Sequence, residues 1–188
     1  MKNICPSFLN DESQANNENL VDFWLSWTFR CANIPETEKG YKKVRNYSRK
    51  ILSYCMTKKT DPKFLNSKKI YSIKCCKYFP IDNGQIDLLV ELNVDNVNYV
   101  LVFENKVNAL IGKGQLKKYK LSIDKKYKNK NFQIIYIFLR AQDSFLPNDE
   151  QLCAKSNFTP ILYWELQNLF NKSGFTGNDL FDEFWFKW

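Results

Sequence analysis

Residues 84–119 contain two apolar runs separated by a polar turn and followed by a basic segment, and this order restricts the fold more than any other part of the chain. The segment reads GQIDLLVEL, VDNVN and YVLVFENKVNALIGKGQLKKY. Each apolar run has the length of a β-strand, and a two-residue turn at Asp95 and Asn96 suits the asparagine-rich loop between them. The pattern therefore predicts a β-hairpin followed by a helix.

The predicted hairpin brings two acidic side chains together. Its turn pairs Val94 with Val97, and counting back along both strands pairs Asp87 with Glu104. The Cβ atoms of directly paired residues lie about 5 Å apart, so the two carboxylates repel each other unless something positive lies between them. A hard divalent cation with oxygen ligands fits this position. Lys106 follows Glu104 by two residues and therefore shares its face of the strand.

This arrangement resembles the active site of the PD-(D/E)XK nuclease superfamily, with Asp87 in QID and with Glu104 and Lys106 in ENK. The sixteen residues between Asp87 and Glu104 are a normal separation for that hairpin. Gln115 and Tyr119 in QLKKY resemble the QxxxY motif of one bacterial branch. The resemblance implies that the two acids bind Mg²⁺ or Mn²⁺ and that Lys106 positions or activates the attacking water. It also implies that Gln115 and Tyr119 line the same catalytic site.

Two further candidate metal ligands come from the resemblance. The carbonyl oxygen of Asn105 is one of them. Many superfamily members bring another acid to the metal from their first helix, and Glu18 in NENLVDFWLSW resembles that acid. An acid in a first helical turn also interacts favourably with the helix dipole, by about 0.3–1 kcal/mol, so both roles stay open for Glu18. Ile86 stands where family members often have proline.

Each part of this pattern also has an ordinary explanation. A Glu-x-Lys spacing is common at the end of a strand on any solvated sheet edge. An aspartate that enters a strand is often part of turn chemistry, and a QxxxY sequence is usually one surface contact and one core tyrosine. The three occur here in the order expected of the nuclease site, on a hairpin that aligns two acids, and this combination favours the nuclease interpretation.

The composition excludes several classes of enzyme. None of the 188 residues is histidine, which excludes Ser-His-Asp triads, Cys-His pairs, histidine-ligated zinc and histidine-based ribonuclease chemistry. The six cysteines form no CxxC pair, so we expect reduced packing residues rather than a zinc or redox site. No apolar run is long enough for a membrane span, and residues 1–13 contain no apolar signal core, so we expect a cytoplasmic protein.

Positive charge is concentrated in two blocks of the sequence. Residues 39–77 contain 13 lysine or arginine residues and one acid, and residues 106–130 contain nine lysines and one acid. A genome that encodes lysine freely accounts for the number of lysines but not for the absence of acids from the same blocks. The segregation favours a surface that binds a polyanion. The candidate phosphate contacts are Lys42, Lys43, Arg45, Arg49, Lys113, Lys117 and Lys118.

The remaining elements complete an α/β order. We expect helices at 17–30, 41–56, 114–128 and 164–172, strands at 70–79, 132–139 and 158–164, a mobile segment at 1–16 and an aromatic helix at 178–188. The continuously apolar run at 132–139 predicts a strand covered on both faces, as in parallel pairing. The fold class is α/β, with one domain over residues 1–188. The resemblance implies a restriction-endonuclease-like core, in which helices flank a mixed β-sheet of four to five strands.

Three functions are compatible with these features. The first is an Mg²⁺- or Mn²⁺-dependent nuclease that hydrolyses phosphodiester bonds, for which the resemblance favours DNA over RNA and implies a role in defence against phage or foreign DNA. The second is a non-catalytic nucleic-acid-binding or scaffold subunit that keeps the fold, although the intact Asp87, Glu104 and Lys106 disfavour it. The third is a protein-interaction module that binds a partner or a second copy through the aromatic C-terminal helix.

Overall fold

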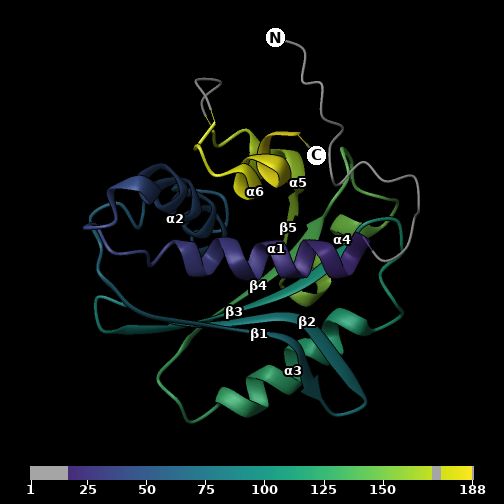
Figure 1. Cartoon of the computed structure of the whole chain (residues 1–188). Coiled ribbons are helices and arrows are strands. Elements are labelled where there is room, and N and C mark those ends of the chain that lie inside the picture. Colours follow the sequence, from purple (N-terminus) through teal and green to yellow (C-terminus); the bar gives the residue numbers. More distant parts are fainter. Residues whose placement is uncertain (1–16, 171–174, 188) are drawn as a thin grey trace.

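The computed structural model describes residues 17–170 and 175–187, which form a five-stranded mixed sheet with helices on both faces (Figure 1). Residues 1–16, for which the sequence predicts mobility, lie outside the described residues, as do the side chains of residues 17 and 18. The strands are β1 (Ile70–Ile81), β2 (Gly84–Val94), β3 (Val97–Lys106), β4 (Gln133–Arg140) and β5 (Thr159–Leu162). Their order in the sheet is the order of the sequence, which confirms the predicted mixed α/β architecture.

The predicted hairpin register is confirmed. Asp95 and Asn96 both have positive φ, at 48° and 67°, as a two-residue hairpin turn of the mirror-image type requires. Val94 pairs with Val97, and the antiparallel pairing of β2 with β3 continues to the pair of Leu88 with Phe103. β1 is antiparallel to β2, whereas β4 is parallel to both β3 and β5. The parallel pairing of β4 agrees with its continuously apolar sequence.

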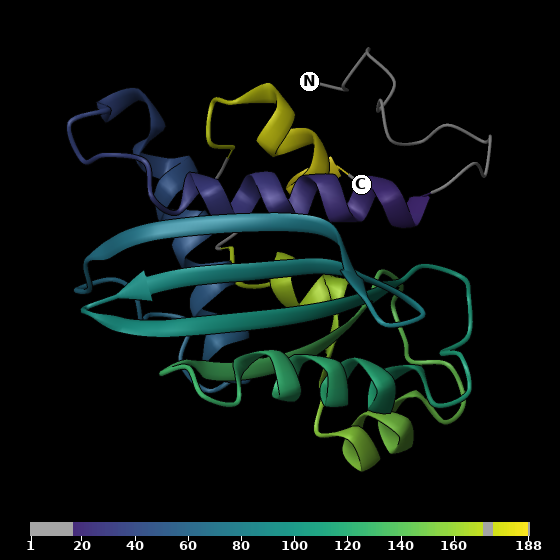
Figure 2. The same ribbon diagram turned by 90° about the horizontal axis from the view of Figure 1, so that it is seen from below.

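Helices cover both faces of this sheet (Figures 1 and 2). One face carries α1, α2, α5 and the C-terminal turns, and the other carries α3 and α4. The helices are α1 (Asn17–Cys31), η1 (Lys39–Tyr41), α2 (Lys42–Met56), α3 (Gln115–Tyr127), α4 (Asp149–Ser156), α5 (Tyr163–Gln167), α6 (Asp179–Asp182) and η2 (Glu183–Lys187). Among the described residues, no helix is long and apolar enough to cross a membrane.

The alternation of side chains along β3 decides which face receives the predicted catalytic residues. Leu101 and Phe103 pack in the core on the α1 side, whereas Val100 and Val102 pack with α3. Because side chains alternate with a period of two, the residues that follow Val102 at even spacing also face α3. This places Glu104 and Lys106 next to the start of that helix.

Leu20, Trp24 and Trp27 recur along α1 at i, i+4 and i+7, a spacing that predicts a core-facing stripe, but the structure buries a different face of the helix. Leu20, Trp24 and Trp27 are only partly buried, because they lie on the side of the helix that meets the C-terminal turns. Trp24 stacks on Phe184 with ring centroids 5.2 Å apart. The face that is fully buried in the core consists of Val21, Leu25 and Phe29.

The aromatic C-terminal segment packs onto the core. It forms the short helix α6 and one π-helical turn, η2, rather than one continuous helix. Phe181, Phe184 and Trp185 are buried, and the Trp185 indole donates a hydrogen bond to Thr28 Oγ1 at 3.0 Å. Trp188 lies outside the described residues. The sequence predicts an apolar face made of Leu180, Phe181, Phe184, Trp185 and Trp188, and within the described residues Leu180 alone of this face is largely exposed. Core packing therefore accounts for the described aromatic side chains of this face.

Candidate active site

The predicted acidic pair lies where β2 begins and β3 ends. Leu88 is opposite Phe103, so the next position places Asp87 opposite Glu104. The backbone N–H of Asn105 donates to Asp87 Oδ2 at 2.8 Å and holds the aspartate at the end of β3. The two predicted metal ligands therefore meet across neighbouring strands.

Glu104 is completely buried, and its two carboxylate oxygens have different surroundings. Oε1 accepts from Gln115 Nε2 at 2.6 Å and lies 2.7 Å from Lys106 Nζ. Oε2 is also buried but has no hydrogen-bond partner among the described residues. A buried carboxylate oxygen without a partner loses its hydration without compensation. The oxygen is therefore available to a ligand that the protein itself does not supply.

The electrostatics of the site show a shortage of positive charge. Burial raises the pKa of Glu104 well above its usual range, the neighbouring Asp87 raises it further, and Lys106 only partly opposes both effects. One ammonium group thus does not balance two adjacent carboxylates in a site shielded from water. A cation close to both acids would supply the missing charge.

Gln115 and Tyr119 lie one turn apart at the start of α3, and Gln115 contacts both Glu104 and Tyr119. Gly114 has φ 71°, which a glycine adopts without steric cost, and the helix starts directly after it. Gly112 N–H donates to Gln115 Oε1 at 2.9 Å, so the amide group is oriented with its Nε2 toward Glu104 and Tyr119. Tyr119 is buried, and burial, followed by the charge of Glu104, raises the pKa of its hydroxyl.

Asn105 connects the site to α1 on the opposite face of the sheet. Its side-chain Nδ2 donates to Asp22 Oδ1, and its own Oδ1 is buried without a partner among the described residues. Asp22 is 2% exposed. The sequence analysis did not consider Asp22, and the side chain of Glu18, its candidate on the same helix, lies outside the described residues. Asp22 follows Glu18 by four residues, so the same helical periodicity could have identified it.

Tyr78 is a second residue that the sequence analysis missed. Lys77 pairs with Leu88 and Phe79 pairs with Ile86, so Tyr78 stands opposite Asp87, with φ 54°. Positive φ is rare for a bulky residue and is found at sites where the surrounding structure enforces it. Burial raises the pKa of Tyr78, and the charges of Asp22 and Asp87 raise it further. No sequence pattern identifies such a residue.

Arg49, in the first basic block, is bound to the protein's own backbone. Its Nε donates to Ala32 O at 3.0 Å, and its Nη1 donates to Leu65 O at 2.8 Å and to Lys68 O at 3.1 Å. These contacts join α1 and α2 to the loop before β1. The guanidinium group therefore has a structural role in this conformation.

The other basic candidates of this block also lie away from the acidic pair. Arg45 pairs with Glu36 at 3.0 Å, and Lys43 Nζ donates to Phe175 O at 3.1 Å. Lys42 is exposed on the same helix, α2. Figure 1 shows α2 beside the C-terminal half of α1, whereas Asp22 belongs to the N-terminal half. The basic candidates on α2 therefore do not border the acidic pair.

The second basic block borders the site directly. Lys113, Lys117 and Lys118 are exposed at the start of α3, next to Gln115. Lys118 Nζ donates to Asn83 O at 2.9 Å and so reaches the turn between β1 and β2. These three lysines lie within two helical turns of Gln115 and Tyr119, the predicted catalytic residues on α3.

The donor set at the site fits a small divalent cation that keeps water ligands. The described residues contain no group of three or more histidine, cysteine, aspartate or glutamate side chains arranged to hold a metal. Magnesium, however, is commonly held by one or two carboxylates and several waters. Asp87, the free Oε2 of Glu104 and the Asn105 carbonyl supply such a set on the side of β3 that carries the charge deficit.

Comparison with known proteins gives one result. Residues 8–176 match the family described as the PD-(D/E)XK nuclease superfamily, which covers most of the chain and includes every predicted catalytic residue. No match was found among curated proteins or among solved structures. The family match agrees with the acidic pair, the buried lysine and the mixed sheet, and the chain belongs to the PD-(D/E)XK nuclease superfamily.

Proposed function

We propose that this protein is an Mg²⁺- or Mn²⁺-dependent nuclease that hydrolyses phosphodiester bonds in DNA. The observation that carries the proposal is the buried Oε2 of Glu104, which has no partner among the described residues and lies beside the charge of Asp87. An unpaired buried carboxylate oxygen costs stability, so a ligand that pairs with it stabilises the site. A bound cation gives that oxygen a partner.

In this proposal the residues of the chain have distinct tasks. Asp87, Glu104 and the Asn105 carbonyl hold the cation, which lowers the pKa of a bound water and offsets charge on the phosphate. Lys106 lies at the same acid, where its ammonium group stabilises negative charge that develops on the phosphate. Gln115 orients Glu104 through Oε1 and leaves Oε2 for the cation.

The polyanionic substrate is inferred from the charges next to the site. Lys113, Lys117 and Lys118 are exposed on the element that carries Gln115, so a backbone phosphate near the acidic pair lies within their reach. Contacts of this kind bind nucleic acid with little dependence on its sequence. The family resemblance implies DNA rather than RNA and a role in defence against foreign DNA, and the sequence leads us to expect a cytoplasmic location. We include them in the proposal.

A cleavage assay tests the proposal. Plasmid, linear DNA and RNA are incubated with the protein in Mg²⁺, in Mn²⁺ and in chelator, and we expect cleavage of DNA only with metal. Asp87→Ala, Glu104→Ala and Lys106→Ala should each abolish cleavage, whereas binding of nucleic acid should largely survive. Wild-type rates in Glu104→Ala would refute the assignment. Binding without cleavage by the wild type would instead support a non-catalytic subunit.

The salt dependence of binding tests the role of the basic residues. Each lost phosphate contact lowers the log–log salt slope for duplex DNA by about 0.9, so Lys117→Glu with Lys118→Glu should lower it by about two. The matched variant carries Lys42→Glu and Lys43→Glu, two exposed lysines on α2. A smaller effect of the α2 pair would show that α3 carries the phosphate contacts. A salt-independent affinity of the wild type would refute binding by charge.

A further inference from the structure

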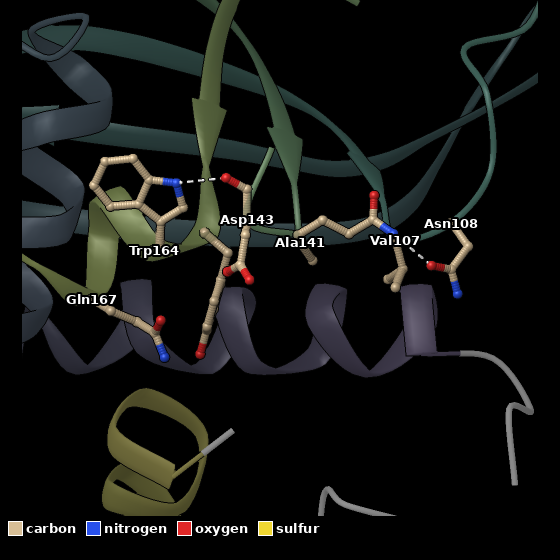
Figure 3. A pocket seen from close by; sticks show the side chains of 8 residues that line it. Val107, Asn108, Ala141, Asp143, Trp164 and Gln167 are labelled. Atoms are coloured by element: carbon tan, nitrogen blue, oxygen red, sulfur yellow. Dashed lines mark hydrogen bonds between the residues drawn. The ribbon is translucent and has the colours of Figure 1, made fainter. Parts of the chain in front are cut away.

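A pocket opens at the carboxyl ends of β3, β4 and β5, directly beyond the catalytic lysine (Figure 3). Val107 and Asn108 follow Lys106, and Ala141 follows Arg140, whose Cα pairs with that of Lys106. Ala141 N–H also donates to Lys106 O at 2.9 Å. The pocket thus begins one residue beyond Lys106 on two adjacent strands. Its volume of about 330 Å³ lies within the usual range for small-molecule sites, roughly 300–1,000 Å³.

Trp164 forms one end of this pocket. It belongs to α5, directly after β5, and is 40% exposed although it is among the largest apolar side chains of the protein. Its indole N–H donates to Asp143 O at 3.1 Å, as Figure 3 shows. This hydrogen bond uses the polar edge of the ring and fixes its orientation. The ring therefore presents an aromatic surface to the pocket without a polar atom that needs a partner.

An amide pair forms the other end of the pocket. Gln142 Nε2 donates to Asn108 Oδ1 at 2.7 Å. The remaining groups of the pair, Gln142 Oε1 and Asn108 Nδ2, have no hydrogen-bond partner among the described residues. Exchanging the nitrogen and oxygen positions of both amides would still leave one amino group and one carbonyl oxygen. The pair therefore offers N–H donors and a carbonyl acceptor side by side.

The charge of the lining disfavours a phosphate in this pocket. The described lining residues include no lysine or arginine, and they include the carboxylate of Asp143. The Arg140 guanidinium is turned away to Asp149, and its Nη1 donates to Val107 O at 3.1 Å and Ala109 O at 2.8 Å. These contacts fix the wall that carries Asn108. A flat, neutral ligand with hydrogen-bonding edges fits this combination of aromatic surface, amide pair and absent positive charge.

We propose that this pocket binds an unpaired nucleobase of the substrate strand, stacked on Trp164, with its edge toward Asn108 and Gln142. The assignment of the ligand to a substrate strand rests on the proposed nuclease function. A base stacks on an aromatic ring with little dependence on its identity, and the base edge supplies the donors and acceptors that the amides lack. The neighbouring phosphate would then lie toward Lys106. The protein accordingly acts on strands that expose a base next to the cut, such as single strands or frayed ends.

Binding to two single strands of equal charge tests the pocket. One is an ordinary oligodeoxynucleotide, and the other is an abasic strand of the same length. Affinities are measured in chelator, so that cleavage does not interfere. Wild type should bind the strand with bases about tenfold more tightly, in line with the cost of losing one stacked base. Trp164→Ala should reduce this ratio to near one, and Trp164→Phe should keep most of it.

Fluorescence provides a second readout. A base stacked on Trp164 should quench tryptophan emission, and Trp164→Phe should remove that part of the quenching while the affinity stays close to wild type. The matched control is Tyr71→Ala, which removes an aromatic side chain of similar exposure from the start of β1, at the opposite end of the sheet. This control should keep the full tenfold ratio. An equal loss of the ratio in the control would overturn a specific role of the pocket.

The outcomes separate this inference from the nuclease assignment. Metal-dependent cleavage together with an unchanged ratio in Trp164→Ala would overturn the pocket alone. If the wild type does not cleave, yet its preference for the strand with bases is lost in Trp164→Ala, only the nuclease assignment would be overturned. A free nucleoside monophosphate supplies the same base without a strand. Equal affinity for the mononucleotide and the strand would overturn the assignment to the substrate strand.

Discussion

Two buried acid–base pairs lie side by side in this protein, and they differ in how completely they are satisfied. Lys106 on β3 and Arg140 on β4 are register partners at the end of the sheet. Each contacts a buried carboxylate, Glu104 at 2.7 Å and Asp149 at 2.7 Å respectively. The two pairs have the same charges and similar depth, so the differences between them reflect their tasks.

In the pair of Arg140 and Asp149 all three guanidinium nitrogens donate hydrogen bonds, and we call this pair saturated for that reason. Arg140 donates two bonds to Asp149 Oδ2 and two to backbone carbonyls, and Leu146 N–H adds a third to the same carboxylate oxygen. At Glu104, in contrast, one buried oxygen is left without a partner among the described residues. The saturated pair stabilises the loops around the site, and the unsaturated pair lies where we propose that a cation and a substrate bind.

The largest expected effect is on stability, at the saturated pair. Arg140→Met leaves the carboxylate of Asp149 buried without its charge partner, a change that typically costs about 3–5 kcal/mol. We therefore expect a loss of this size in the free energy of unfolding, measured by urea denaturation. Adding Asp149→Leu should recover much of the loss, because the unpaired charge is then removed as well.

The matched change at the other pair should cost much less stability. Burial and Asp87 already raise the pKa of Glu104, so the acid can take up a proton when Lys106→Met removes its partner. Equal losses of stability in Arg140→Met and Lys106→Met would break the comparison, because they would show that both pairs serve the fold in the same way.

The second effect is on activity, and here the variants of Glu104 and Lys106 should lose more than the variants of Arg140 and Asp149. Glu104→Gln and Lys106→Met should each lower kcat for metal-dependent cleavage by about 10²–10³, the size expected when one group that stabilises charge is removed. Asp149→Asn, assayed well below its melting temperature, should keep kcat within severalfold of wild type. A loss of kcat in Asp149→Asn as large as that in Glu104→Gln would contradict the separation of roles.

The third effect concerns the stability gained from metal. A ligand that binds only the folded state adds about 2.7 kcal/mol at a hundredfold excess over Kd. Asp87→Asn removes a charge that opposes Glu104 and also removes a ligand. In chelator the variant should melt at or above the temperature of wild type, yet it should gain much less from millimolar Mg²⁺ or Mn²⁺. Equal metal-induced shifts in both proteins would refute a site shared by Asp87 and Glu104.

The unsaturated pair was predictable from the sequence, and the saturated pair was not. The hairpin register follows from strand alternation and a two-residue turn, both of which are local, and it aligned Asp87 with Glu104 correctly. Gln115 and Tyr119 were found because their spacing on one helix is also local. Arg140 and Asp149 lie in different elements joined by a loop, and no local period relates them.

Two other features depend on tertiary structure in the same way. The basic blocks at 39–77 and 106–130 are both evident in the sequence, but their places in the fold are not. Lys68 pairs with Asp95 at the hairpin turn, nine residues along the sheet from Glu104 and therefore roughly 30 Å away. Tyr78 has a positive φ, a backbone conformation that the sequence does not predict for a tyrosine. Its position opposite Asp87 appears only when β1 pairs with β2.

The smallest expected effect distinguishes the two acids of α1. Asp22 accepts a hydrogen bond from the Asn105 side chain, and the backbone of Asn105 in turn donates to Asp87. Residues that orient metal ligands in this way typically change metal affinity by 10–100-fold when they are replaced. Asp22→Asn should therefore raise the metal concentration needed for half-maximal cleavage by about tenfold. Glu18→Gln should change it less than twofold, as expected of an acid that only interacts with the helix dipole.

Titrating activity with Mg²⁺ in both variants decides between these acids. Thermal melts in chelator serve as the control, because a role in the helix dipole would lower stability slightly without changing the metal requirement. A shift in Glu18→Gln larger than that in Asp22→Asn would assign the helix acid to Glu18, one turn earlier in α1. Asp22 would then be only a structural partner of Asn105, and it would have no part in binding the metal.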